Sequence, residues 1–186
     1  MPETSKPTEP RLILPRPVAL VGLMGVGKTT VGRRLADALA VPFRDADEEI
    51  EKAAGLSVSD IFAAFGEAGF RDGEQKVISR LLDDGPQILA TGGGAFVQPA
   101  THDIIKQKAV TVWLKTDLRV IARRVAHRNH RPLLRDRDPM EVLREHEAKR
   151  YPFYARADIT VDTGDQSHGK SVELVIGALK TFLEPK

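Results

Sequence analysis

The side chains best suited to chemistry gather in a glycine-rich stretch near the start of the chain. Residues 22–29 read Gly-Leu-Met-Gly-Val-Gly-Lys-Thr and fit the pattern G-x-x-x-x-G-K-[ST], the P-loop that holds nucleotide phosphates. The glycines let the backbone wrap closely, so that successive N–H groups point inward at phosphate oxygens. Lys28 is then placed to neutralise the outer phosphates, and the Thr29 hydroxyl to ligate Mg²⁺.

Two carboxylates, Asp45 and Asp47, follow a short strand that we expect within residues 41–47. Strand alternation puts both on one side if the strand persists. They then lie at the carboxyl edge of the sheet, where ligands gather in doubly wound folds. The competing interpretation is that one of them caps the next helix, expected from Glu48 to Ala54.

Three consecutive glycines, Gly92, Gly93 and Gly94, follow a third strand predicted over residues 87–90. Three glycines in a row cost backbone entropy, and they make sense where a ligand must approach the main chain closely. A flexible loop is the alternative interpretation.

A basic segment from Arg123 to Arg137 also contains two histidines and Pro132. Such a run is usually a solvated surface or a nucleic-acid patch. Beside a P-loop it has a third interpretation, a mobile lid whose arginines close over the transferring phosphate. We expect this lid at about residues 124–138.

The elements that must position these residues alternate along the chain. Apolar residues 18–21 before the P-loop are typical of a buried parallel strand, and helical spacing follows it in residues 31–40. We expect the remaining helices near residues 48–54, 57–65, 72–82, 99–108, 117–125, 138–150 and 170–183, and the last two strands at 110–114 and 159–161. Residues 66–71 are expected to interrupt a helix, and residues 151–154 to break one. The prediction is an α/β fold with a parallel sheet covered on both faces.

Length and composition fit one domain with its own core. The chain has 186 residues, of which 41% are hydrophobic and 29% charged. A net charge of +2 is too balanced to indicate nucleic-acid or membrane binding, and the lack of cysteine excludes disulfides and thiolate catalysis. No apolar run approaches the ~20 residues of a membrane span. We expect a mobile tail at residues 1–16 without a secretory signal, a single domain at 17–186, and a cytoplasmic enzyme.

Taken in order, the motifs of this chain resemble those of the shikimate kinases. They are GLMGVGKTTVGRRLA (22–36), DAD (45–47), GEAGFRDGE (66–74), ATGGG (90–94), RPLL (131–134) and KRYPFY (149–154). The resemblance covers nearly the whole chain from Val18 onward. It implies a three-layer P-loop kinase fold with a central five-stranded parallel sheet and an arginine-bearing lid. It also implies ATP-dependent phosphorylation of the 3-hydroxyl of shikimate in aromatic amino-acid biosynthesis, with Mg²⁺. We expect a monomer.

The resemblance also implies a role for each matching position. The ATP phosphates would meet the loop formed by Gly25, Val26, Gly27, Lys28, Thr29 and Thr30, and other nucleotide contacts would come from Arg124, Arg131 and Gln166. Magnesium would be held by Thr29 and, through water, by Asp45. Shikimate would be bound by Asp47, Arg71, Gly92, Gly93, Gly94 and Arg150. The catalytic residues would be Lys28, Asp47 and Arg131, with Asp47 orienting the attacking hydroxyl and the two cations offsetting phosphate charge.

Three other functions remain as alternatives. Another small-molecule P-loop kinase, for gluconate or a nucleoside monophosphate, would share the P-loop and the lid, but the DAD, GFR and GGG motifs favour shikimate. A GTPase would need an N-K-x-D segment, which is absent. A nucleic-acid-binding ATPase would rest on the basic segment, but the near-neutral charge and the lack of interleaved aromatic residues argue against it. We expect no nucleic-acid or membrane partner.

Overall fold

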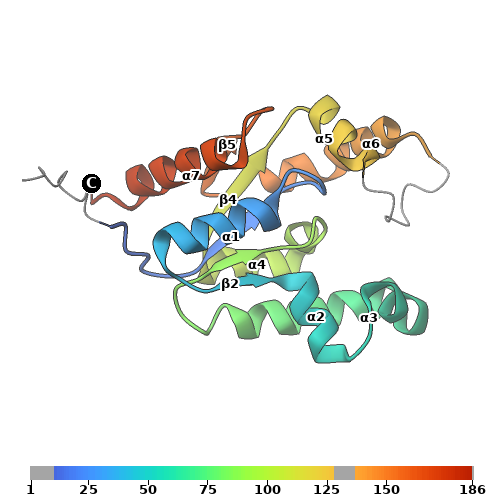
Figure 1. The fold of residues 1–186 in the computed structure, drawn as a ribbon. Helices are drawn as coiled ribbons and strands as arrows, with labels where there is room; N and C mark the ends of the chain where they lie inside the picture. The colour runs from blue at the N-terminus through green and yellow to red at the C-terminus, as the bar shows by residue number, and fades with distance from the viewer. Residues whose placement is uncertain (1–10, 128–136, 186) are drawn as a thin grey trace, which may run out of the picture.

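The computed structural model describes residues 11–127 and 137–185, and within them a central parallel sheet organises the chain (Figure 1). Its strands are β1 (Val18–Val21), β2 (Phe43–Asp45), β3 (Ile88–Ala90), β4 (Val110–Lys115) and β5 (Ile159–Asp162). They lie in the order β2-β3-β1-β4-β5, with every pairing parallel. The predicted five-stranded parallel sheet is confirmed, and the P-loop follows its central strand.

Helices cover both faces of this sheet. They are α1 (Lys28–Leu39), α2 (Ala46–Ala54), α3 (Val58–Leu81), α4 (Pro99–Lys108), α5 (Leu118–Ala126), α6 (Pro139–Tyr154) and α7 (His168–Leu183), with a short 3-10 turn, η1 (Ala95–Val97). Helices α1 and α7 pack together, while α3, α4 and α6 form the other layer through contacts with each other and with η1 (Figure 1). Right-handed crossovers between parallel strands require this division. The chain moves toward one edge of the sheet through α1, from β1 to β2, and toward the other edge in the later crossovers. The helices of the two directions therefore cover opposite faces of the sheet.

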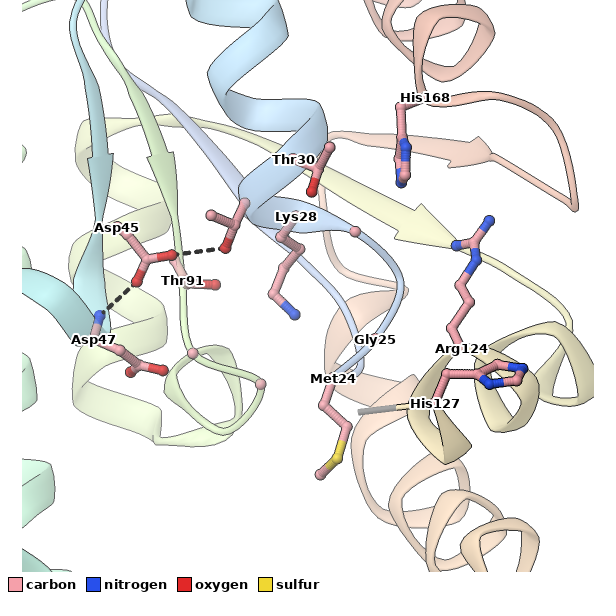
Figure 2. Close-up of a pocket in the computed structure, with 14 residues that line it drawn as sticks. Met24, Gly25, Lys28, Thr30, Asp45, Asp47, Thr91, Arg124, His127 and His168 are labelled. Carbon is pink, nitrogen blue, oxygen red and sulfur yellow. Dashed lines mark hydrogen bonds between the residues drawn. The ribbon is translucent and has the colours of Figure 1, made fainter. Parts of the chain in front are cut away.

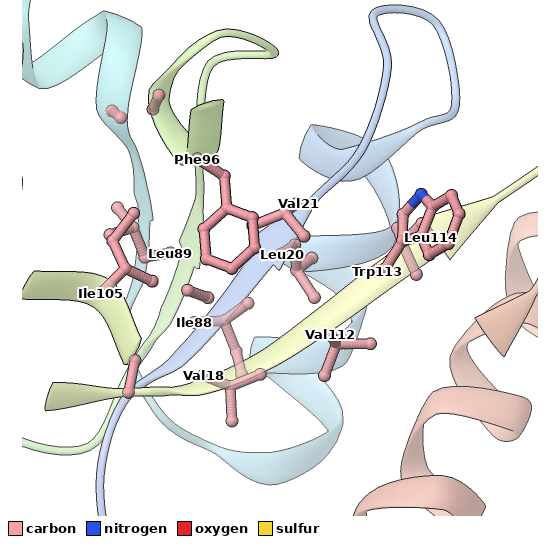
Figure 3. Packing of buried hydrophobic residues seen from close by; sticks show 14 of the residues in the cluster. Val18, Leu20, Val21, Ile88, Leu89, Phe96, Ile105, Val112, Trp113 and Leu114 are labelled. Atoms are coloured by element: carbon pink, nitrogen blue, oxygen red, sulfur yellow. The ribbon is translucent and has the colours of Figure 1, made fainter. Parts of the chain in front are cut away.

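The core consists of apolar side chains between the sheet and both helical layers. All four residues of β1 are completely buried, as a central strand covered on both faces requires. Phe96, just after the glycine turn, is also fully buried and packs among the strand residues shown in Figure 3. Among the helices that the structure describes, none is both long and apolar enough to cross a membrane.

Helix starts and interruptions follow local sequence signals. Ser57 caps α3 by accepting a hydrogen bond from the Asp60 amide, as its capping-box sequence predicts. Gly66 interrupts the same helix with a φ of 68° and a ψ of −176°, so a break is confirmed there, but residues 67–71 are helical and the expected interruption over residues 66–71 is too long. That dihedral region is open only to glycine, so the sequence and the kink agree.

Two expected boundaries are wrong. Helix α6 continues through Pro152 to Tyr154 instead of breaking at residue 151. A proline in the last helical turn removes only one hydrogen bond, and burial of the Tyr154 ring holds the turn in place. The packed chain also begins before residue 17, because Leu14 of the expected tail is buried in the core. Residues 1–10 lie outside the described residues.

Candidate active site

A cleft of about 320 Å³ opens at the carboxyl ends of the strands. The loops after β1 and β3 and the end of β2 meet there, as expected for a doubly wound sheet. Figure 2 shows Asp45 and Asp47 on one side of Lys28, and Arg124, His127 and His168 on the other. The side chains and loops that line the cleft are Met24, Gly25, Gly27, Lys28, Thr29, Thr30, Asp45, Asp47, Thr91, Gly92, Gly93, Arg124, His127 and His168.

The P-loop has the conformation that its glycines allow. Gly22 has a φ of 146°, and a Cβ atom there would lie 2.7 Å from the Leu114 carbonyl oxygen, so only glycine fits between β1 and β4. Helix α1 begins at Lys28, so the N–H groups at its N-terminus point toward the cleft. The Lys28 ammonium donates to the carbonyl oxygens of Gly22 and Leu23, at 2.7 and 2.9 Å. The lysine therefore already lies across the loop that receives the phosphates.

Asp45 performs two tasks at the end of β2. Its Oδ1 accepts hydrogen bonds from the amides of Asp47 and Glu48 and caps α2, so the capping interpretation is right for this residue. Its Oδ2 accepts the Thr29 hydroxyl at 2.7 Å, across the cleft floor (Figure 2). The strand ends at Asp45, so strand alternation does not extend to Asp47, although both carboxylates line the same cleft. The first turn of α2 places Asp47 instead.

Asp47 faces the cleft, where solvent reaches its carboxylate, while protein atoms surround it on the inner side. Burial on that side raises the pKa of Asp47, the negative charge of Asp45 raises it further, and Lys28 works against both. A carboxylate with a raised pKa is a better proton acceptor than an ordinary aspartate. Asp47 is thus suited to receive a hydrogen bond or a proton from a hydroxyl in the cleft.

The three glycines after β3 make room for charged side chains. A Cβ atom at Gly94 would lie 2.4 Å from a guanidinium nitrogen of Arg71, and one at Gly93 would lie 2.7 Å from Nη1 of Arg150. At Gly92 it would lie 3.1 Å from Oδ1 of Asp47. Two arginines from different helices and one carboxylate therefore surround the glycine turn. The protein's own side chains approach this backbone closely, and the expected approach of a ligand stays a prediction.

Glu74 holds one of these arginines and was missed by the sequence analysis. Arg71 donates to Glu74 Oε2 at 2.7 Å, and the Glu74 side chain is only 1% exposed. Burial raises the pKa of Glu74, and the hydrogen bond from Arg71 opposes that effect. The other oxygen of this carboxylate has no hydrogen-bond partner among the described residues. The signal was present in the GFRDGE motif, where residues three apart share a helix face.

Comparison with known proteins decides which family this geometry represents. The family model described as "Shikimate kinase" matches residues 24–180, which is most of the chain. This chain belongs to the shikimate kinase family. A curated shikimate kinase from Caulobacter vibrioides is 57% identical over 163 residues, covering 88% of this chain and 82% of that protein. One from Rhodopseudomonas palustris is 52% identical over 168 residues, covering 90% and 83%.

Solved structures agree with the family assignment. A shikimate kinase from Acinetobacter baumannii, determined in complex with shikimate, matches with a TM-score of 0.86 at 34% identity. The match covers 91% of this chain and 96% of that one. The three-layer P-loop kinase fold expected from the sequence is therefore confirmed.

The nucleotide side of the cleft brings together part of the predicted set. Arg124 lines the cleft and donates to the Val26 carbonyl oxygen at 3.3 Å. Two histidines that the sequence analysis left without a role also line it, and the His168 ring packs 3.4 Å from the position of a Cβ at Gly27. Gln166 does not line the cleft; it lies two residues before His168, in the loop that leads to α7. Arg131 lies outside the described residues.

Proposed function

We propose that this member of the shikimate kinase family transfers the γ-phosphate of ATP to the 3-hydroxyl of shikimate, giving shikimate 3-phosphate for aromatic amino-acid biosynthesis. The observation that carries the proposal is the convergence of Arg71, Arg150 and Asp47 around the glycine turn, beside a P-loop. Two guanidinium groups and a carboxylate complement a small anion that carries hydroxyl groups. The relative from Acinetobacter baumannii, which was solved with shikimate, supports the same acceptor.

Arg71 and Arg150 would bind the carboxylate of shikimate, because a planar guanidinium matches a carboxylate with two parallel hydrogen bonds. The backbone N–H groups of Gly92, Gly93 and Gly94 would add close contacts. Asp47 would accept the hydrogen bond of the attacking hydroxyl and draw off its proton as the phosphate arrives. In this assignment the two arginines hold the carboxylate of the acceptor and Asp47 receives its hydroxyl.

The P-loop would hold the nucleotide phosphates through Gly25, Val26, Gly27, Thr30 and the amides at the start of α1. Lys28 would offset charge on the transferring phosphate, since positioning and electrostatics supply most of the catalysis in this reaction class. Arg124, and with it Gln166, would contact the nucleotide outside the phosphates. Arg131 and the lid, expected at about residues 124–138, stay predictions; residues 124–126 belong to α5.

The Thr29 hydroxyl and the Asp45 carboxylate would hold Mg²⁺ on the phosphates. Both are hard oxygen donors, they lie 2.7 Å apart, and they are next to the P-loop. Residues 11–127 and 137–185 contain no group of three or more His, Cys, Asp or Glu side chains placed for a metal. A small donor set fits Mg²⁺, which keeps several waters and shares phosphate oxygens. When bound, the ion supplies positive charge to the phosphate oxygens. We further propose a cytoplasmic monomer.

The deciding experiment measures ATP consumption with shikimate, gluconate, a nucleoside monophosphate or no acceptor. Of these acceptors, we expect only shikimate to support turnover of ATP. The phosphorus of the product should couple to the proton at carbon 3 in NMR spectra. Faster turnover with gluconate or a nucleotide would contradict the assignment of the acceptor. ATP hydrolysis that is indifferent to all acceptors would contradict the kinase assignment itself.

A further inference from the structure

Tyr154, the last residue of α6, bonds directly to the glycine turn. Its side chain is fully buried, and its hydroxyl donates a hydrogen bond to the carbonyl oxygen of Gly93. This bond spans 61 residues of sequence and joins the end of a helix to the loop after β3. A buried hydroxyl with a specific partner fixes the place of that partner more firmly than apolar packing does.

Arg150 meets the same glycine from the same helix. It precedes Tyr154 by four residues, so the two side chains lie one above the other on one face of α6. The Arg150 Nη1 atom lies 2.7 Å from the position of a Cβ at Gly93. The Tyr154 hydroxyl donates its one proton to the Gly93 carbonyl oxygen, so the lone pairs of the phenol oxygen are available to accept a hydrogen bond from the Arg150 guanidinium. Burial raises the pKa of Tyr154 to about 12, and the nearby Arg150 charge and hydrogen bond partly oppose this effect.

The phenol ring itself is held in place on the side of the P-loop. It packs against Trp113 of β4, with ring centroids 5.8 Å apart. Trp113 in turn lies 3.6 Å from the Cβ position of Gly22, and a Cβ atom at Gly93 would lie 3.7 Å from the Gly22 carbonyl oxygen and the Met24 amide nitrogen. Tyr154 therefore connects the loop that would hold phosphate with the arginine that would hold the acceptor.

We propose that Tyr154 is a positioning residue for the acceptor, whose hydroxyl sets Gly93 and the Arg150 guanidinium in the relative placement that binds the acceptor's carboxylate. This inference rests on the function proposed above. The hydroxyl does not touch the reacting atoms; it acts through the two groups that it joins. Loss of the hydroxyl would free Arg150 to adopt other rotamers and would leave the Gly93 carbonyl without its partner.

Tyr154→Phe tests the inference, because it removes one oxygen and keeps the ring. We expect the KM for shikimate to rise about tenfold while the KM for ATP changes less than about twofold, since one buried hydrogen bond is lost on the acceptor side only. Tyr151→Phe is the matched control. Tyr151 packs against the same Trp113 ring, with centroids 4.8 Å apart, but its hydroxyl makes no side-chain hydrogen bond to another described residue. Equal rises in both KM values, or none, would overturn the proposal.

A double-mutant cycle with Arg150→Ala asks whether Tyr154 acts through that arginine. We expect Tyr154→Phe to weaken shikimate binding much less in the Arg150→Ala background than in the unchanged chain, because coupled residues are not additive. Full additivity would show that the hydroxyl works by another route. If the protein without substitutions has no activity on shikimate, the proposed function is refuted. If that protein is active and Tyr154→Phe leaves the KM for shikimate unchanged, only this inference is refuted.

A second measurement is made on protein that keeps Tyr154, so it does not require Tyr154→Phe to fold. The chain has two tyrosines, so 3-fluorotyrosine labelling gives two fluorine resonances, which Tyr151→Phe assigns. We expect shikimate to shift the Tyr154 resonance and to leave Tyr151 nearly unmoved. A Tyr154 resonance that ignores saturating shikimate would overturn the inference even if Tyr154→Phe proves unstable.

Discussion

Charged side chains in the cleft are held by backbone and by one another before any ligand arrives. Lys28 donates to two carbonyl oxygens of its own loop, and Asp45 accepts from two amides and from Thr29. Such preorganisation lowers the cost of arranging groups around a transferring phosphate. Substitutions here should therefore change binding or transfer far more than they change the fold.

Lys28→Ala is expected to leave the fold intact and to abolish phosphoryl transfer. The side chain donates to two loop carbonyls, which water can satisfy at the cleft surface, so stability should change by less than about 1 kcal/mol. Circular dichroism and thermal melting check the fold, and single-turnover assays check the transfer. Near-normal turnover at saturating ATP would refute the role of Lys28.

Arg150→Ala is expected to weaken shikimate binding by about 2–5 kcal/mol and to leave ATP binding nearly unchanged, because a bound carboxylate loses a desolvated partner.

Arg71→Ala should have the same effect on shikimate and should also lower stability, since it leaves the buried Glu74 carboxylate without its charged partner. Adding Glu74→Gln to Arg71→Ala should restore stability but not affinity. Calorimetric titration and melting curves separate the two effects; equal loss of both ligands would indicate a structural role.

His146 makes stability depend on pH. Burial lowers the pKa of His146 to about 4, and the positive charge of Arg150 contributes in the same direction. The unfolded chain binds a proton near the ordinary value of 6.5 while the folded chain does not, so stability is present above that pH and is lost as pH falls toward 4. In His146→Leu this part of the pH dependence should vanish. Urea unfolding between pH 4 and 7.5 measures it, and parallel curves for the two proteins would contradict the prediction.

Helix α3 shows how one residue shapes an element that carries a site residue. The Gly66 kink separates the first part of α3 from the part that bears Arg71 and Glu74. Gly66→Ala should destabilise the fold by about 1–3 kcal/mol, because its dihedral angles are closed to other residues even though a Cβ would meet no atom. The matched control is Gly177→Ala in α7, which has ordinary helical dihedrals and open space. It should stabilise by about 0.5–1 kcal/mol.

Denaturant unfolding of these two glycine variants distinguishes backbone strain from a general effect of adding a methyl group. We expect opposite signs at Gly66 and Gly177. If both variants gain stability, the kink is not fixed by the backbone of Gly66, and the placement of Arg71 must come from the packing of Phe70, which is buried and stacks on Phe62 at 4.5 Å.

Across the whole molecule, the sequence predicts best where a local rule acts alone. Periodicity located the strands and most helices, and the P-loop motif located the loop after β1 that lines the cleft. Prediction from the sequence failed where tertiary contacts override the local rule. Pro152 stays helical because Tyr154 is buried, and Leu14 joins the core. The sequence analysis also missed His168, because its packing against Gly27 is a property of the folded chain, and Glu74, whose spacing of three residues from Arg71 was the available signal.

Unfolding of the whole chain is expected to be a single cooperative transition. One sheet runs from β2 to β5, and both helical layers share its core, so no described element has a core of its own. Trp113, the one tryptophan of the chain, is buried in β4 between α6 and the P-loop, and its fluorescence reports on this core. We expect its urea transition to coincide with that of far-ultraviolet circular dichroism. Shikimate with ADP should move both midpoints upward together, because ligands bind only the folded chain. An earlier transition in the circular dichroism signal alone would show that part of the helical structure unfolds separately from the sheet, and would contradict a single domain.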